Sequence, residues 1–128
     1  MQQLSTLTDK KIENIKIAND IALKDDYLIL NKYEFNYATF VNITFEDTDF
    51  IDCEFISSRF VNCTFINCNF RGVSFENMYI NKSEFIDCDL SLNVVDNLTI
   101  TETKSNTKMF CLHKIENNIN IDTEIKIK

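Results

Sequence analysis

The 128-residue chain has no proline, no tryptophan, one glycine (Gly72) and one histidine (His113). The lack of proline and glycine argues against a sandwich built on tight turns. With a single histidine and no Cys-x-x-Cys pair, we expect no zinc site and no cofactor. No apolar run approaches the roughly 20 residues needed to span a bilayer, so we expect no membrane partner. The first residues lack the basic-then-apolar pattern of a signal peptide, which predicts a cytoplasmic protein, although secretion as an effector stays open.

A five-residue period dominates what is present. Phenylalanine stands at every fifth position from Phe35 to Phe75, and Ile80, Phe85 and Leu90 continue the series. This period fits neither a helix nor a flat strand, and a fixed short period is typical of stacked repeats. Smaller residues lie two positions earlier, on the same side of an extended segment, and share the interior with the large ones. These smaller residues are Ala38, Ile43, Thr48, Cys53, Ser58, Cys63, Cys68, Val73, Met78, Ser83 and Cys88.

The segments FIDCEF (Phe50–Phe55) and FVNCTFINCNFRGVSF (Phe60–Phe75) resemble the pentapeptide-repeat family. The resemblance implies an all-β solenoid, a right-handed four-sided β-helix with four pentads per coil. Residues twenty apart then stack, and residues 28–100 provide 15 pentads, or about 3.75 coils. The predicted ladders are Phe35/Phe55/Phe75, Phe45/Phe65/Phe85 and Phe50/Phe70/Leu90.

Four of the five cysteines fall on the small interior position of the repeat. A free cysteine behaves there as a small apolar side chain, so the repeat accounts for them better than a disulfide framework does. Cys68 and Cys88 are expected to stack, but a bond between them would require distortion. A reducing compartment follows from this interpretation.

The two ends depart from the period. Residues 1–27 are predicted to cap the first coil, with a helix from Thr8 to about Asp20. An irregular half-coil built from Ile21, Leu23 and Tyr27 is the alternative. In residues 101–128, Thr101–Lys108 is predicted to be a loop. The alternation that follows predicts two short strands, which form either a hairpin over the last coil or a dimer contact. The residues of this candidate dimer contact are Ile119, Ile121, Ile125 and Ile127.

The net charge of −7 comes mainly from residues 31–90, which contain ten acidic and four basic residues. In a four-sided coil, most of these acids fall on two adjacent faces, which we call the acidic edge. It consists of Glu46, Asp47, Asp49, Asp52, Glu84, Asp87 and Asp89. Apolar residues just after the large interior positions should point outward and form an outer apolar row. This row consists of Val41, Ile51, Ile56, Val61, Ile66 and Ile86. Such a row is either a contact surface or an effect of strand propensity.

These features favour a non-enzymatic protein-binding scaffold. No nucleophile has an evident base, and a filled coil leaves no cavity for a substrate. The resemblance implies one alternative, an acidic DNA mimic that binds a type II topoisomerase such as gyrase. The sign of the charge agrees, but a rod of about 18 Å is short, since duplex DNA of that length carries about ten phosphate charges. A second alternative is a bacterial effector or phage-encoded protein that binds a host protein. Direct nucleic-acid binding is disfavoured because no basic patch is present.

Overall fold

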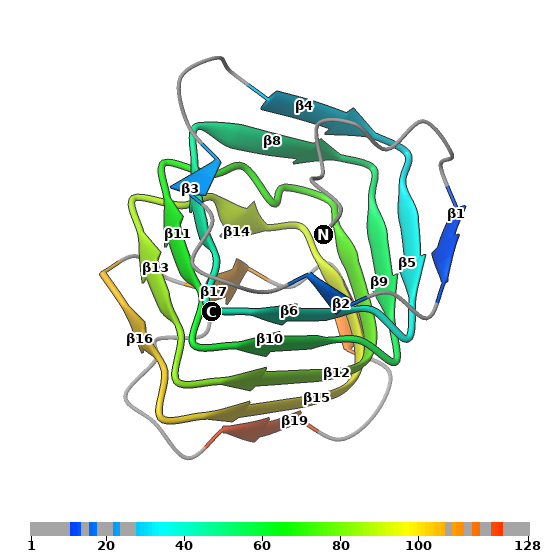
Figure 1. Ribbon diagram of the computed structural model, residues 1–128. Coiled ribbons are helices and arrows are strands. Elements are labelled where there is room, and N and C mark those ends of the chain that lie inside the picture. Colours follow the sequence, from blue (N-terminus) through cyan, green and yellow to red (C-terminus); the bar gives the residue numbers. More distant parts are fainter. Residues whose placement is uncertain are drawn as a thin grey trace.

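The computed structural model describes residues 11–13, 16–17, 22–23, 28–106, 109–111, 114–115 and 119–121. Every regular element in these residues is a β-strand, and the strands wind into a four-sided coil (Figure 1). All the strand pairs run parallel, as required when each coil stacks on the one before it. No helix that could cross a membrane occurs in these residues. The chain is therefore a β-solenoid, as its period predicts.

We number the four faces in chain order. Face 1 contains β1 (Lys11–Glu13), β5 (Glu34–Asn36), β9 (Glu54–Ile56), the first parts of β12 (Ser74–Asn81) and β15 (Val94–Thr101), and β18 (Lys114–Ile115). Face 2 contains β2 (Lys16–Ile17), β6 (Thr39–Val41), β10 (Arg59–Val61), the last parts of β12 and β15, and β19 (Ile119–Ile121).

Face 3 contains β3 (Ala22–Leu23), β7 (Thr44–Glu46), β11 (Thr64–Ile66), β13 (Glu84–Ile86) and β16 (Lys104–Ser105). Face 4 contains β4 (Leu28–Asn31), β8 (Thr48–Ile51), an isolated bridge at Asn69, β14 (Leu90–Ser91) and β17 (Met109–Cys111). Faces 1 and 3 lie on opposite sides of the coil (Figure 1).

The interior is filled as the period predicts. Phe35 pairs with Phe55, twenty residues later, which confirms four pentads per coil. All the large and small interior residues named above are buried. On face 3 the Phe65 ring stacks on Phe45 at 5.0 Å and on Phe85 at 4.7 Å, with planes within 7°. On face 4 the Phe50 and Phe70 rings are 4.5 Å apart. Face 2 differs, because the Phe40 and Phe60 planes cross at 61°.

The chain turns each corner with one residue in the left-handed backbone region. From Lys32 to Glu102, every fifth residue has a positive φ between about 48° and 75°. Asparagine, aspartate and glycine tolerate this conformation best. They occupy nine of these fifteen corners: Asn42, Asp47, Asp52, Asn62, Asn67, Gly72, Asn77, Asp87 and Asn97. The repeat is therefore rich in asparagine because its corners require a left-handed backbone conformation.

The predicted N-terminal helix is wrong for the part of Thr8–Asp20 that the structure describes. Residues 11–13 and 16–17 are strands β1 and β2, which pair with the first full coil. Ile12 pairs with Phe35, 23 residues later, and Leu23 pairs with Phe45, 22 residues later. The first coil is therefore two to three residues longer than the others, and this breaks the period without ending the solenoid. Of the half-coil alternative, Leu23 lies in strand β3, and Ile21 and Tyr27 lie outside the described residues.

The predicted loop at Thr101–Lys108 is also wrong over residues 101–105. Thr101 ends β15, and β16 pairs with β13, so the coil continues. The strand predicted at Ile119 and Ile121 is confirmed as β19. It pairs in parallel with residues Leu98–Ile100 of β15 and thereby extends face 2 of the stack. Ile125 and Ile127 lie outside the described residues, and the dimer contact stays a prediction.

Candidate interaction surfaces

The coil brings the acidic edge together on two adjacent faces, as predicted. Glu46 and Glu84 project from face 3, and Asp49 and Asp89 from face 4. Asp47 and Asp87 occupy the corner between these faces, and Asp52 occupies the next corner. All seven side chains are exposed or half-buried.

Asparagine separates the carboxylates along the stack. In the corner between faces 3 and 4, Asn67 donates its side-chain amide to Asp47 at 2.7 Å, and Asn106 donates to Asp87 at 2.9 Å. On face 4, Asn69 bridges between Asp49 and Asp89. Asp47 and Asp49 therefore lie two coils away from Asp87 and Asp89. This separation is about 9.6 Å at the usual strand spacing. Interposed amides avoid the cost of like charges placed directly opposite each other.

Asp49 is half-buried in the acidic edge. Its Oδ1 atom is buried and has no hydrogen-bond partner. Burial raises the pKa of Asp49 above its usual value, and a hydrogen bond from Asn69 partly opposes this rise. A positive group that approached Asp49 would favour its ionised form.

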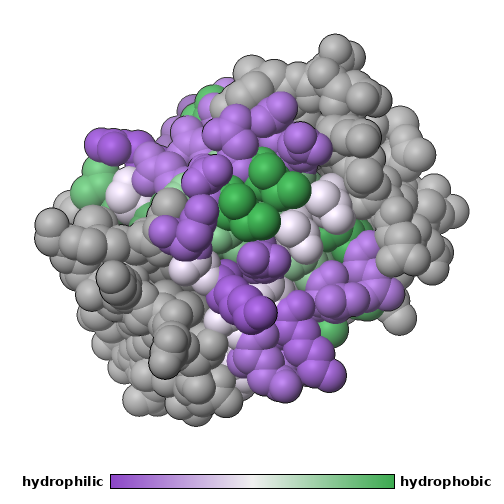
Figure 2. All heavy atoms as spheres, turned by 90° about the vertical axis from the view of Figure 1, so that its left-hand side faces the viewer, coloured by the Kyte–Doolittle hydropathy of each residue, from purple (hydrophilic) through white to green (hydrophobic). Residues whose placement is uncertain are grey.

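The residues of the outer apolar row face outward, but the coil distributes them over all four faces. Val41 and Val61 lie on face 2, Ile56 on face 1, Ile51 on face 4, and Ile66 and Ile86 on face 3. Five of its six residues are half-buried, and Ile51 is 36% exposed. Ile66 and Ile86 are paired in register on face 3. Figure 2 shows this side of the molecule, with apolar atoms at its centre and hydrophilic atoms around them. An apolar centre with a charged rim is the usual anatomy of a protein interface.

Face 1 carries negative charge that was not predicted as part of the acidic edge. This face carries Glu34, Glu54, Glu76 and Asp96, and its segments 33–37, 53–57, 73–77 and 93–97 contain no lysine or arginine. Two of these acids precede the large interior residue of their pentad and two follow it. The signal was therefore visible in the sequence once charges were assigned to all four faces.

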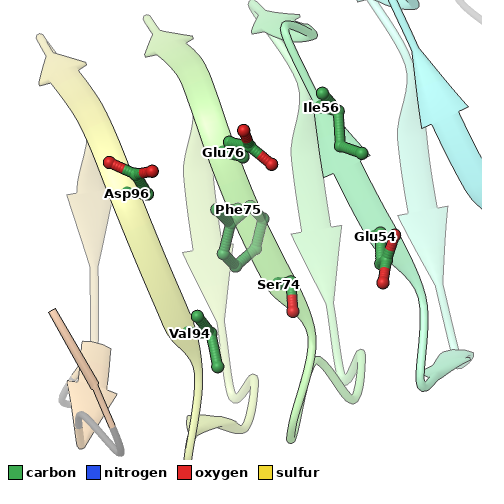
Figure 3. Close-up of a pocket in the computed structure, with 7 residues that line it drawn as sticks. All are labelled: Glu54, Ile56, Ser74, Phe75, Glu76, Val94 and Asp96. Atoms are coloured by element: carbon green, nitrogen blue, oxygen red, sulfur yellow. The ribbon is translucent and has the colours of Figure 1, made fainter. Parts of the chain in front are cut away.

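A groove of about 310 Å³ lies on face 1 (Figure 3). Residues of β9, β12 and β15 line it: Glu54, Ile56, Ser74, Phe75, Glu76, Val94 and Asp96. Ser74 is the small residue between Glu54 and Val94 in one row across the strands. Ile56, Glu76 and Asp96 form the other row.

Face 2 is the least acidic side of the coil. Between residues 38 and 102 its only acidic residue is Glu102, whereas Arg59 and Lys82 are basic. The Arg59 guanidinium lies 5.8 Å from the centre of the Tyr79 ring, a cation–π contact between adjacent coils. The negative surface is therefore confined to faces 1, 3 and 4.

Four cysteines fill small interior positions of the coil. Cys53, Cys63, Cys68 and Cys88 are free and buried. Each Sγ donates to a backbone carbonyl, as from Cys63 to Phe40 at 3.2 Å. Burial raises the pKa of both Cys53 and Cys63 to about 11, so both are neutral at physiological pH. Within the described residues, no group of three His, Cys, Asp or Glu side chains could hold a metal ion.

Comparison with known proteins decides the family. The model for pentapeptide repeats matches eight copies, over residues 34–65 and 58–92. This chain is a pentapeptide-repeat protein. No curated protein sequence matches it significantly. Among the solved structures that match is a trypsin-treated variant of QnrB1, described as a plasmid-mediated fluoroquinolone resistance protein. It is 16% identical, the match covers 73% of this chain and 61% of that chain, and the TM-score is 0.19. The match thus spans less than two thirds of the QnrB1 chain.

Proposed function

We propose that this pentapeptide-repeat protein is a non-enzymatic scaffold that binds another protein through its acidic edge. The observation that carries the proposal is the fixed array of carboxylates on faces 3 and 4. Strands hold Glu46, Asp49 and Glu84, and an isolated bridge holds Asp89. Hydrogen bonds from asparagine hold the corner residues Asp47 and Asp87. Because these side chains are ordered before binding, they lose little conformational entropy when a partner binds.

The partner that fits is a basic protein surface with an apolar centre. Lysine and arginine would meet the acidic edge, and an apolar side chain would cover Ile66 and Ile86. Charge complementarity of this kind sets specificity and association rate. The four buried thiols support a reducing, cytoplasmic location.

The test compares wild-type protein with an edge variant, Glu46→Gln/Asp47→Asn/Asp49→Asn/Asp52→Asn, as immobilised baits. Asparagine already occupies the equivalent corners at Asn62 and Asn67, so the variant is expected to fold. A matched variant, Glu34→Gln/Glu54→Gln/Glu76→Gln/Asp96→Asn, removes the same number of charges from face 1. We expect a basic protein to bind to wild type and to the face 1 variant. The same protein should not bind to the edge variant. Identical sets of proteins on all three baits would contradict the proposal.

A type II topoisomerase such as gyrase is the second candidate partner. The observation that favours it is the regular spacing of carboxylates on two adjacent faces, a negative rod that a DNA-binding enzyme could accept in place of phosphates. We expect the wild-type protein and the face 1 variant to inhibit DNA supercoiling by purified gyrase, and the edge variant to lose this inhibition. No inhibition by wild type well above the enzyme concentration would eliminate this candidate and leave the scaffold proposal standing.

A further inference from the structure

Two of the four interior cysteines stack on one another. Cys68 and Cys88 hold the same small interior position in consecutive coils, just after the corner between faces 3 and 4. The strand pairing before them and the isolated bridge after them are in register, and the Asp89 N–H donates to the Cys68 carbonyl at 3.0 Å. The other two cysteines lie in ladders where no described neighbour is a cysteine: Cys53 between Tyr33 and Val73, and Cys63 between Ile43 and Ser83.

The two stacked thiols have the same surroundings, one coil apart. The Cys68 Sγ donates to the Phe45 carbonyl at 3.4 Å, and the Cys88 Sγ donates to the Phe65 carbonyl at 3.3 Å. The sulfur atoms therefore lie within about one coil spacing of each other, roughly 4.8 Å. A hydrogen bond between the two side chains lowers the pKa of Cys88 and raises the pKa of Cys68. The pair thus behaves as one unit.

This spacing suits a bridging metal ion better than a disulfide. A disulfide requires sulfur atoms about 2.05 Å apart and Cβ atoms about 3.8 Å apart, so it would pull the two coils together. Bonds from a metal to thiolates are about 2.3 Å long, so two such bonds in a line span about 4.6 Å. A thiolate–metal–thiolate unit would therefore fit between the coils as they stand.

The number and softness of the ligands select the ion. Zn²⁺ takes four ligands in structural sites, and the described residues contain no cluster of three His, Cys, Asp or Glu side chains. Soft thiolates favour Cu(I), for which two thiolates in a line form a complete coordination shell. The resulting unit carries one negative charge. The backbone N–H groups of Thr48 and Cys68 donate to the sulfur atoms of Cys68 and Cys88, respectively, and would stabilise that charge.

We propose that Cys68 and Cys88 form a buried two-coordinate site for Cu(I). On binding, two S–H bonds break, two S–Cu bonds form and two protons pass to solvent, with no change in oxidation state. Cys88 is 5% exposed and is the most accessible of the four interior thiols, so the ion would enter at its corner. The site lies inside the coil, so it goes beyond the proposed function and can fail without it.

The experiment is a competition for Cu(I) between the reduced full chain and the coloured chelator bicinchoninate, in oxygen-free buffer. We expect wild type to remove one Cu(I) per chain from the chelator. Cys68→Ser and Cys88→Ser should each weaken binding roughly 100-fold or more, because either exchange destroys the two-point attachment. Serine is suitable because Ser58 and Ser83 occupy the same interior position, and circular dichroism checks that each variant is folded.

The matched control is Cys53→Ser/Cys63→Ser, which removes two thiols that do not stack on another thiol. It should bind Cu(I) within about threefold of wild type. X-ray absorption of the copper-loaded protein should show two sulfur neighbours at about 2.3 Å. All variants retain Cys111, so the only difference between the two sets is the stacked pair.

Three results would overturn the proposal. One is equal weakening by the stacked-pair variants and by the control, and another is uptake of Zn²⁺ as tight as that of Cu(I). The third is formation of a Cys68–Cys88 disulfide, detected by mass spectrometry, when wild type is exposed to copper, which would make the pair a redox couple. None of these results affects the acidic-edge test, because that test changes only outward carboxylates.

Discussion

Individual residues carry the strain of this fold at its corners. Six of the fifteen corner residues with positive φ are not asparagine, aspartate or glycine: Lys32, Tyr37, Ser57, Lys82, Leu92 and Glu102. The left-handed conformation costs such residues roughly 1–2 kcal/mol, and asparagine less. These corners are therefore the positions where single substitutions should gain stability.

Leu92→Asn should raise the free energy of unfolding by about 0.5–1 kcal/mol. Leu92 has a φ of 54° and is 44% exposed, so the exchange removes backbone strain and little packing. Ile51→Asn is the matched control, because Ile51 is also apolar and exposed but lies within strand β8. Urea unfolding should show a gain for Leu92→Asn and none for Ile51→Asn. Equal effects of the two exchanges would contradict the strain argument.

The buried thiols predict a loss of stability at alkaline pH. Folding raises the pKa of Cys53 and Cys63 from 9.0 to about 11. Below pH 9 both states hold the protons, so the full stability is present. Between pH 9 and 11 the unfolded state releases protons that the native state keeps, and stability falls.

Urea midpoints measured at pH 8 and 10.5 test this effect. We expect the wild-type midpoint to fall more steeply with pH than that of Cys53→Ala/Cys63→Ala. Alanine is suitable there because Ala38 occupies the same interior position of its own pentad. Parallel pH profiles for the two proteins would show that these thiols do not titrate differently on unfolding.

At the scale of the strand and its ladder, stability depends on interior rings and hardly on outward side chains. Phe65 contacts stacked rings in the coils on both sides of it and is fully buried, whereas its neighbour Ile66 is half-buried and faces outward. Phe65 should therefore contribute much more than Ile66 to the free energy of unfolding, although the two are neighbours in one strand.

Phe65→Ala should lower the free energy of unfolding by about 3–5 kcal/mol, since it removes a ring and leaves a cavity inside the coil. Ile66→Ala truncates the adjacent side chain and should cost less than about 1 kcal/mol, because solvent already reaches it. The same urea titration measures both. A larger cost for Ile66→Ala would reverse the inward and outward assignment of the whole repeat.

The sequence predicted the ladders well and the ends poorly, for a physical reason. Within the repeat, each interior residue is specified by its place in the pentad, so Phe45, Phe65 and Phe85 could be aligned without coordinates. Before Leu28 the offset between paired residues of consecutive coils changes to 22 or 23 residues. The secondary structure there depends on pairing with strands of the next coil, which the local sequence does not show. Ile12 and Ile15 have a spacing that also suits a helix, and pairing of Ile12 with Phe35 overrides it.

The candidate surfaces were predictable to different degrees. The position of the acidic edge on two adjacent faces could be predicted because Glu46-Asp47-Thr48-Asp49 is a dense acidic run in the chain. Its role in binding stays a prediction. The face 1 groove was missed because its acids are isolated in sequence and meet only when coils stack. The hollow itself depends on Ser74 lying between two larger neighbours, Glu54 and Val94, in consecutive coils. No pattern along the chain shows such a difference in side-chain size across strands.

For the whole molecule, the decisive feature is that a stack of parallel coils has two open ends. An uncovered end exposes backbone N–H and C=O groups that can pair with another chain. On face 2, β19 pairs with Leu98–Ile100 of β15, whose Leu98 and Ile100 side chains are fully buried. The last described strand therefore protects the edge of the final complete coil.

Deletion of residues 119–128 should convert that protected edge into a site of self-association. We expect light scattering to show a larger mass than for the full chain. Residues Leu98–Ile100 of β15 lose β19 on one edge but keep β12 on the other, so the freed edge can pair with a second copy. Deletion of residues 122–128 alone keeps β19 and should leave the mass unchanged. If the full chain is a dimer and the longer deletion is a monomer, the region acts instead as the dimer contact predicted at Ile119, Ile121, Ile125 and Ile127. An unchanged mass after the longer deletion would contradict both roles, because β19 would then neither cover an edge nor join two copies.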